Sequence, residues 1–550
     1  MEEACMEMKK QMKIAAAGAA AAVVVGGGIF AYTRLAEGDP KEIVIQAFEN
    51  VYAEGQTAPM EELFGLSEFA KAGASSSRNV GLTLKLDSCS EPAFDAYAGS
   101  GLRIDAKNDV ENSKSSADMG IIYNGMDLVN LDFYYGDDTL MAAVPELSER
   151  VFTLDLGEGL EERLKNSPVL GPVLEQNGVD VSVLTEYMEL LTEQVRQTEE
   201  GKAAAFDWKA LMKRYREGCR AEEDFKKALT VEKGEKASFT MDGKEQACRG
   251  YEVTVSKEAV IGFLRTSSDF FLQDEDLKKD FLKRLELSVK LSQLAGTELE
   301  GQDFPSAQEM QEQTYEDVRT EIDGMIAFLD RSLNDVSMTV HVSKEGRLAS
   351  VKGTTSFNSA GEETEPVSLQ FGCELKGGAY QTQNMAAQAV LEKGTESVHI
   401  EAVKEGVYDG KQLTAGLDLS IENQGETAEK WDITFDGSYN SGDGGFDVRA
   451  AAAQDELELL GFSARGVVDE LEKGKNIHLT LDSLDVSAMG DTGNAVLSGE
   501  YYIRPLTEAI VPLEGEVMDV LAAGEDEWNG VLMEMLFGFI SISGQMDTGN

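Results

Sequence analysis

The chain has 550 residues, with 49 Lys and Arg against 100 Asp and Glu, which gives a formal net charge of -51. Hydrophobic residues make up 42% of it and there are ten prolines, so the composition is that of a chain with packed cores and not of a disordered one. A negative field of this strength repels phosphate backbones and argues against nucleic acid as a partner. Three histidines and five scattered cysteines leave few residues for zinc binding or nucleophilic catalysis.

An uncharged segment near the N-terminus predicts a membrane anchor. Residues 14–33 are rich in Ala, Val and Gly and match the roughly 20 residues that a helix needs to cross a bilayer. Lys9, Lys10 and Lys13 precede the segment, so the positive-inside rule places residues 1–13 in the cytoplasm and the chain from residue 37 outside it. A cleaved signal peptide and a buried core helix are the alternatives. The first of these also predicts export.

The first extracytoplasmic region is predicted to span residues 37–334. Pro40–Gly55 has apolar residues at helical spacing, and from Asn79 the apolar period changes to two, which predicts an antiparallel meander over 79–157. Residues 158–334 read as amphipathic helices. A hairpin over 236–256, around Asp242-Gly243, interrupts them.

The second region is predicted to span residues 336–550. Alternating segments follow one another at intervals of about 10 to 14 residues up to Arg504, which predicts a large antiparallel sheet or an open half-barrel. Apolar residues between Leu506 and Leu521, and again between Trp528 and Phe539, predict a helical tail that covers the open face of the sheet. The predicted class is therefore α+β, with large curved antiparallel meanders packed on amphipathic helices and one transmembrane helix before them.

No catalytic, cofactor-binding or metal-binding motif is recognised in the sequence, so no site residue and no cofactor are predicted. His341, His399 and His478 each lie in an alternating segment and are interpreted as strand histidines. Residues 436–447 resemble a calcium loop only superficially and are interpreted as a hairpin turn. Cys219 and Cys248 are the closest pair of cysteines in the exported part, and a disulfide between them stays open.

Two resemblances bear on function. The segment from Phe133 to Leu147 resembles a hairpin of exported lipoprotein-carrier half-barrels over about fifteen residues. The wider layout of short basic N-terminus, apolar anchor, helix and acidic β-rich ectodomain resembles an uncharacterised family of membrane-anchored extracytoplasmic proteins of Gram-positive anaerobes. That family resemblance implies the same location and carries no activity and no site residues.

Three functional hypotheses follow. The first is a non-catalytic, single-pass anchored extracytoplasmic protein that binds a lipid or another apolar, envelope-derived ligand. The second is a scaffold or interaction module that binds an envelope protein and has no ligand cavity. The third is an envelope hydrolase that uses acidic residues, and two converging carboxylates of raised pKa in a cleft would favour it.

Overall fold

A computed structural model describes residues 39–548 apart from several segments. These segments are 56–58, 74, 178, 180, 183, 186–187, 189–205, 283–284, 286–306, 359–364, 426–427 and 489–492. The predicted anchor over 14–33 lies outside the described residues. Within the part that is described, no helix is both long and apolar enough to cross a membrane.

The described strands form one 20-stranded sheet. Its spatial order runs from β7 through β19 in chain order, continues with β1 to β6 and ends at β20. All neighbours are antiparallel except β20 and β6, which are parallel. The strands are β1 (Arg78–Cys89), β2 (Gly101–Asp109), β3 (Lys114–Tyr123), β4 (Met126–Gly136), β5 (Thr139–Ala143), β6 (Arg150–Asp155), β7 (Thr230–Met241), β8 (Lys244–Val255), β9 (Val336–Val342), β10 (Leu348–Phe357), β11 (Val367–Gly377), β12 (Asn384–Lys393), β13 (Glu396–Tyr408), β14 (Gln412–Gln424), β15 (Glu429–Asn440), β16 (Gly445–Gln454), β17 (Leu457–Glu472), β18 (Asn476–Ala488), β19 (Gly493–Pro505) and β20 (Glu516–Asp519).

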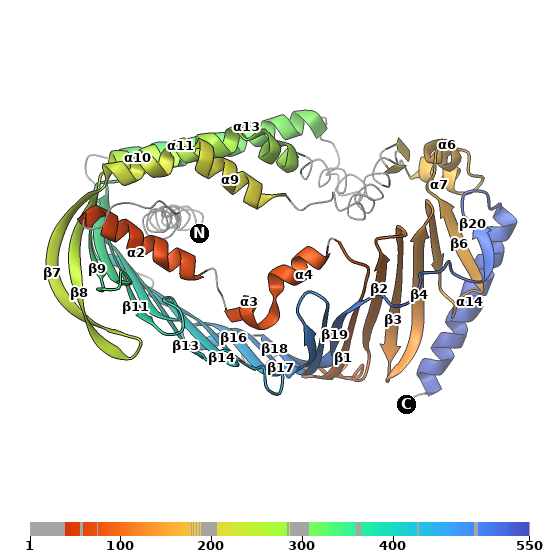
Figure 1. The fold of residues 1–550 in the computed structure, drawn as a ribbon. Coiled ribbons are helices and arrows are strands. Elements are labelled where there is room, and N and C mark those ends of the chain that lie inside the picture. Colours follow the sequence, from red (N-terminus) through yellow and green to blue (C-terminus); the bar gives the residue numbers. More distant parts are fainter. Residues whose placement is uncertain are drawn as a thin grey trace.

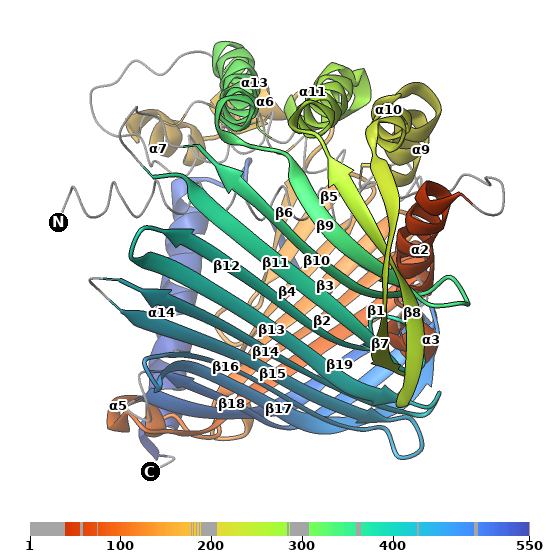
Figure 2. The same ribbon diagram turned by 90° about the vertical axis from the view of Figure 1, so that its left-hand side faces the viewer.

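The sheet is strongly curved and does not close into a barrel. Figure 2 shows β10 to β18 as a front wall and β1 to β6 as a wall behind it, and the two meet through the pairing of β19 with β1. Twist and β-bulges bend a sheet of this kind, and the β17–β18 pairing alone shifts register twice. At the β19–β1 junction a side chain on Gly499 would overlap the carbonyl oxygen of Thr83, so glycine is needed for this close approach.

Helices lie inside the curve and along its upper edge (Figure 1). The largest core joins the β8–β11 part of the sheet to α2, α11 and α13, and includes the fully buried Val44, Val260, Leu329, Val340 and Phe357. A smaller core at the other end of the sheet joins α6 to the strand end at Leu154. The helices used below are α2 (Pro40–Gly55), α3 (Pro59–Phe64), α4 (Leu66–Gly73), α6 (Leu160–Lys165), α9 (Trp208–Gly218), α11 (Lys257–Gln273), α13 (Ala307–Ser332) and α14 (Glu525–Thr548).

Much of the predicted element order is confirmed. The structure contains the predicted helix over 40–55, the meander from residue 79, the hairpin around Asp242-Gly243 and the long series of strands after 336. The division at residue 335 stays a prediction. The sheet itself runs across this position, because β8 pairs with β9.

The predicted tail is wrong in its first half. Residues 506–515 form no helix, and β20 then adds to the sheet edge beside β6. Pro512 explains the absence of a helix, since proline removes a backbone donor and clashes with the preceding turn. The tail also does not cover the open face: α14 packs at the β6–β20 end, where Ser148 Oγ donates to Glu534 Oε2 at 2.6 Å and lowers the pKa of that carboxyl.

Candidate ligand-binding surface

The register of the sheet assigns every strand residue to one of two faces. Val340 on β9 and Val351 on β10 lie opposite each other and belong to the core beneath the helices. Directly paired residues of neighbouring strands lie on the same face of the sheet, so this pair defines the inner face. The pairings between successive strands then identify the inner-face residues of every other strand. On the outer face of β13 to β18 the side chains are mostly polar or charged.

The inner face of β14 to β18 is apolar and open. One cross-strand row, here called the inner-face row, passes through directly paired residues: Leu417, Phe435, Ala450, Phe462, Val486 and Ala495. Phe435 is 40% exposed and Phe462 is 42% exposed, although both point to the side of the sheet that carries the helices. A neighbouring row repeats the pattern with Ile433 and Leu460. Contiguous exposed apolar area of this kind is typical of a binding surface.

Helix α3 covers only one end of this face. Leu63 on α3 packs against Tyr439 and Val468, and the ring centroids of Phe64 and Tyr439 lie 4.6 Å apart. The inner-face row lies further along the same strands, beyond this contact. The open region is therefore bounded on one side by a small core and stays accessible on the other.

The apolar surface continues across the junction between the two walls. Leu484, Leu497 and Leu86 are paired in succession from β18 to β19 to β1. On β2 and β3, Leu102 and Ile121 lie opposite each other on the inner face and are about half exposed. One apolar surface thus extends from β14 to β3.

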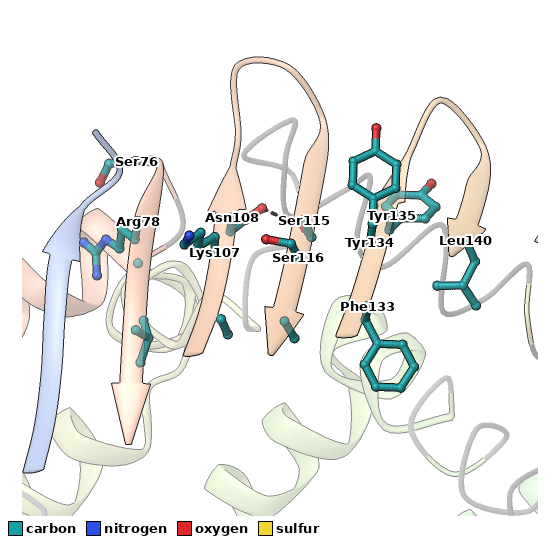
Figure 3. A pocket seen from close by; sticks show the side chains of 14 residues that line it. Ser76, Arg78, Lys107, Asn108, Ser115, Ser116, Phe133, Tyr134, Tyr135 and Leu140 are labelled. Carbon is teal, nitrogen blue, oxygen red and sulfur yellow. Dashed lines mark hydrogen bonds between the residues drawn. The ribbon is translucent and has the colours of Figure 1, made fainter. Parts of the chain in front are cut away.

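A pocket of about 460 Å³ lies on the inner face of β1 to β5 (Figure 3). Its floor is a second cross-strand row of Val80, Ala106, Ala117 and Phe133. The two alanines leave room between the larger residues at either end. In Figure 3, Arg78 and Ser76 lie on the β19 side of the pocket and Leu140 lies on the opposite side.

Two basic residues, Arg78 and Lys107, line this pocket, and Arg78 is the deeply buried one. It is the first residue of β1, it is 8% exposed, and it lies opposite Asn108 on β2. Its Nε and Nη2 atoms are buried and have no hydrogen-bond partner among the residues that the structure describes. Burial lowers the pKa of this guanidinium, and the nearby Tyr501 acts in the opposite direction. Arg78 cannot be recognised from the sequence, since an arginine after a run of serines forms no known motif.

The three histidines lie on three separate strands. His341 Nδ1 is 3.2 Å from Ser350 Oγ, His399 Nε2 is 3.1 Å from Ser397 Oγ, and His478 Nδ1 is 3.2 Å from Asp469 Oδ2. They are strand histidines, as predicted. Among the described residues, no group of three His, Cys, Asp or Glu side chains is placed to hold a metal ion.

The other sequence features also have structural roles. Residues 436–447 form the β15–β16 hairpin, as predicted, and Asn440 and Asp443 accept hydrogen bonds from turn amides. Cys219 and Cys248 are free thiols: the first ends α9 and the second is buried on β8.

One pair of acids meets part of the criterion for a hydrolase. Asp132 and Asp118 are paired across β4 and β3 on the outer face, and burial, together with the charges of Asp118 and Glu146, raises the pKa of Asp132. Arg103 Nη1 lies 3.0 Å from Asp118 Oδ1 and neutralises part of this charge. Neither acid lines either of the two pockets described in the structure. The hydrolase therefore stays a hypothesis, and neither described pocket contains this pair of acids.

Comparisons with known proteins identify no relative of this chain. No protein-family model, no curated protein and no solved structure matches the chain. The evidence on function is therefore the surface described above.

Proposed function

We propose that this chain is a non-catalytic, extracytoplasmic binding protein that is anchored through residues 14–33 and shelters a lipid-like ligand on the inner face of its curved sheet. The observation that carries the proposal is the exposed inner-face row. The protein's own helices cover this side of the sheet only in part, so large apolar side chains there remain in contact with water. A ligand that buries them stabilises the complex by about 25 cal/mol per Å² of apolar surface removed from water.

Three features support this proposal. The apolar surface is continuous from β14 to β3 and ends in a pocket, which suits an elongated ligand better than a compact one. The outer face is polar, so the two faces differ in the way expected if only the inner one meets an apolar partner. The net charge of -51 keeps the body away from an anionic membrane surface, which leaves the inner face free to exchange ligand.

An interaction module is the second candidate, and one observation favours it. Helix α14 packs against the sheet through Val531 and leaves Leu532, Leu536 and Phe537 more than half exposed. An apolar helix side of this kind suits an envelope protein as partner. This candidate and the carrier are compatible, because α14 and the inner-face row lie on different parts of the molecule.

The carrier proposal predicts that the protein retains a ligand from its own host. The full chain is isolated in polymer-bounded membrane patches without detergent, and its lipids are extracted and identified by mass spectrometry. We expect one lipid or acyl species to be enriched in near-stoichiometric amount over an unrelated single-pass protein isolated in the same way. Identical lipid profiles for the two proteins would contradict a tight carrier and leave the interaction module.

A further inference from the structure

We propose that the ligand is an amphiphile with one anionic head group, and that Arg78 binds this head group while the apolar part lies along the inner face. This inference rests on the proposed function and adds the chemical class of the ligand. It starts from a guanidinium that is more than nine-tenths buried at the end of an apolar pocket, with two donors unused.

An unused donor pair in this position is energetically costly. Buried polar groups in proteins are almost always hydrogen-bonded, and a buried charge without a partner destabilises the fold by several kcal/mol. The chain has 100 acidic residues, yet none of the ion pairs among the described residues includes Arg78. A partner that comes from outside the chain would remove this cost.

The geometry of the free edge defines the partner. Nε and Nη2 lie side by side on one edge of a guanidinium, and this edge matches the two oxygens of a carboxylate or phosphate. The same chain contains an example: Arg214 uses Nε and Nη2 to bind Asp274 at 2.8 and 2.7 Å. Arg78 presents the same edge, and its side chain lines the pocket.

The position of Arg78 also fixes the orientation of the ligand. The row Val80, Ala106, Ala117 and Phe133 starts beside Arg78 and leads away from it across four strands. A head group at Arg78 therefore places its chain on this floor, or on the apolar surface that continues towards Leu86 and Leu497. A ligand with an apolar chain and no charge would leave the guanidinium unpaired.

The test compares two probes that differ only in the head group. The full chain is held in lipid nanodiscs, with empty nanodiscs as the reference for partitioning, and binding of hexadecanoate and of hexadecanol is measured. We expect hexadecanoate to bind roughly ten- to a hundredfold more tightly, because hydrogen bonds to charged groups contribute about 1.5–3 kcal/mol. Arg78→Gln abolishes this preference and leaves hexadecanol binding unchanged. The control, Arg449→Gln on the exposed outer face, retains the preference.

Stability separates this role from a structural one. We expect the unloaded Arg78→Met variant to unfold at the same or a higher temperature than the wild type, since the substitution removes an unpaired buried charge. A clear loss of stability in both Arg78→Met and Arg78→Gln would show that the arginine has an internal partner and would overturn the proposal.

Other outcomes are also decisive. Equal binding of both probes by the wild type would overturn the head-group site and leave the proposed function intact, whereas binding of neither probe would contradict both. If inorganic phosphate raises the unfolding temperature of the wild type but not of Arg78→Gln, and hexadecanoate shows no preference, the site takes a free anion and not an amphiphile.

Discussion

Replacing Ala450 by glutamate is expected to weaken binding of hexadecanol by about tenfold or more. Ala450 lies on the inner face between Phe435 and Phe462, to which it is paired across the neighbouring strands. A ligand on the inner-face row would bury the new carboxylate without a partner, and this costs free energy in the bound state only. Titration of the full chain with the uncharged probe measures the effect and avoids repulsion between two charges.

The chain offers a matched control for this variant. Ala451 is the next residue of the same strand, also partly buried, and lies on the outer face between Thr434 and Gly461. Ala451→Glu therefore adds the same charge at nearly the same place and should leave the affinity within about twofold. Equal losses in the two variants would indicate an effect on the sheet itself and would count against a ligand on the inner face.

Truncation of Phe357 is expected to lower the stability of the fold much more than truncation of an exposed inner-face residue. This residue ends β10, is 2% exposed and belongs to the core beneath α11 and α13. Phe357→Ala removes most of a buried ring and leaves a cavity, so the free energy of unfolding should fall by about 3–5 kcal/mol. Chemical denaturation of the full chain, followed by tryptophan fluorescence, measures the change.

Leu460→Ala provides the comparison. Leu460 lies on the inner face of β17 and is 59% exposed, so its truncation removes little buried area and should cost less than about 1 kcal/mol. The contrast between the two variants reports whether the inner face is open in solution. A loss at Leu460 as large as the loss at Phe357 would mean that another part of the chain covers this face.

Periodicity predicts most of the strands, and it fails where composition or bulges hide the period. Alternation does not identify β12 (Asn384–Lys393), because its alanines favour helix as much as strand and only its neighbours decide between them. Alternation also does not identify β17 (Leu457–Glu472), since its register shifts break the alternation of apolar and polar residues.

The candidate surface could be predicted only in part. Strands such as β15 place Trp431, Ile433 and Phe435 on one face, and this alternation is visible in the sequence. Whether helices cover that face depends on contacts between residues far apart in the chain, such as Leu63 with Val468. The unpaired state of Arg78 likewise depends on which side chains of the neighbouring strands reach it, and no local pattern reports this.

Photo-crosslinking at two adjacent positions of β15 can show whether a ligand lies on the inner face of the sheet. A benzophenone side chain replaces Phe435 on the inner face or Thr434 on the outer face of the full chain in its own host, and adducts are identified by mass spectrometry after irradiation. We expect a lipid-like adduct at position 435 and none at position 434. Adducts of the same kind and yield at both positions, or none at 435, would contradict a ligand on the inner face.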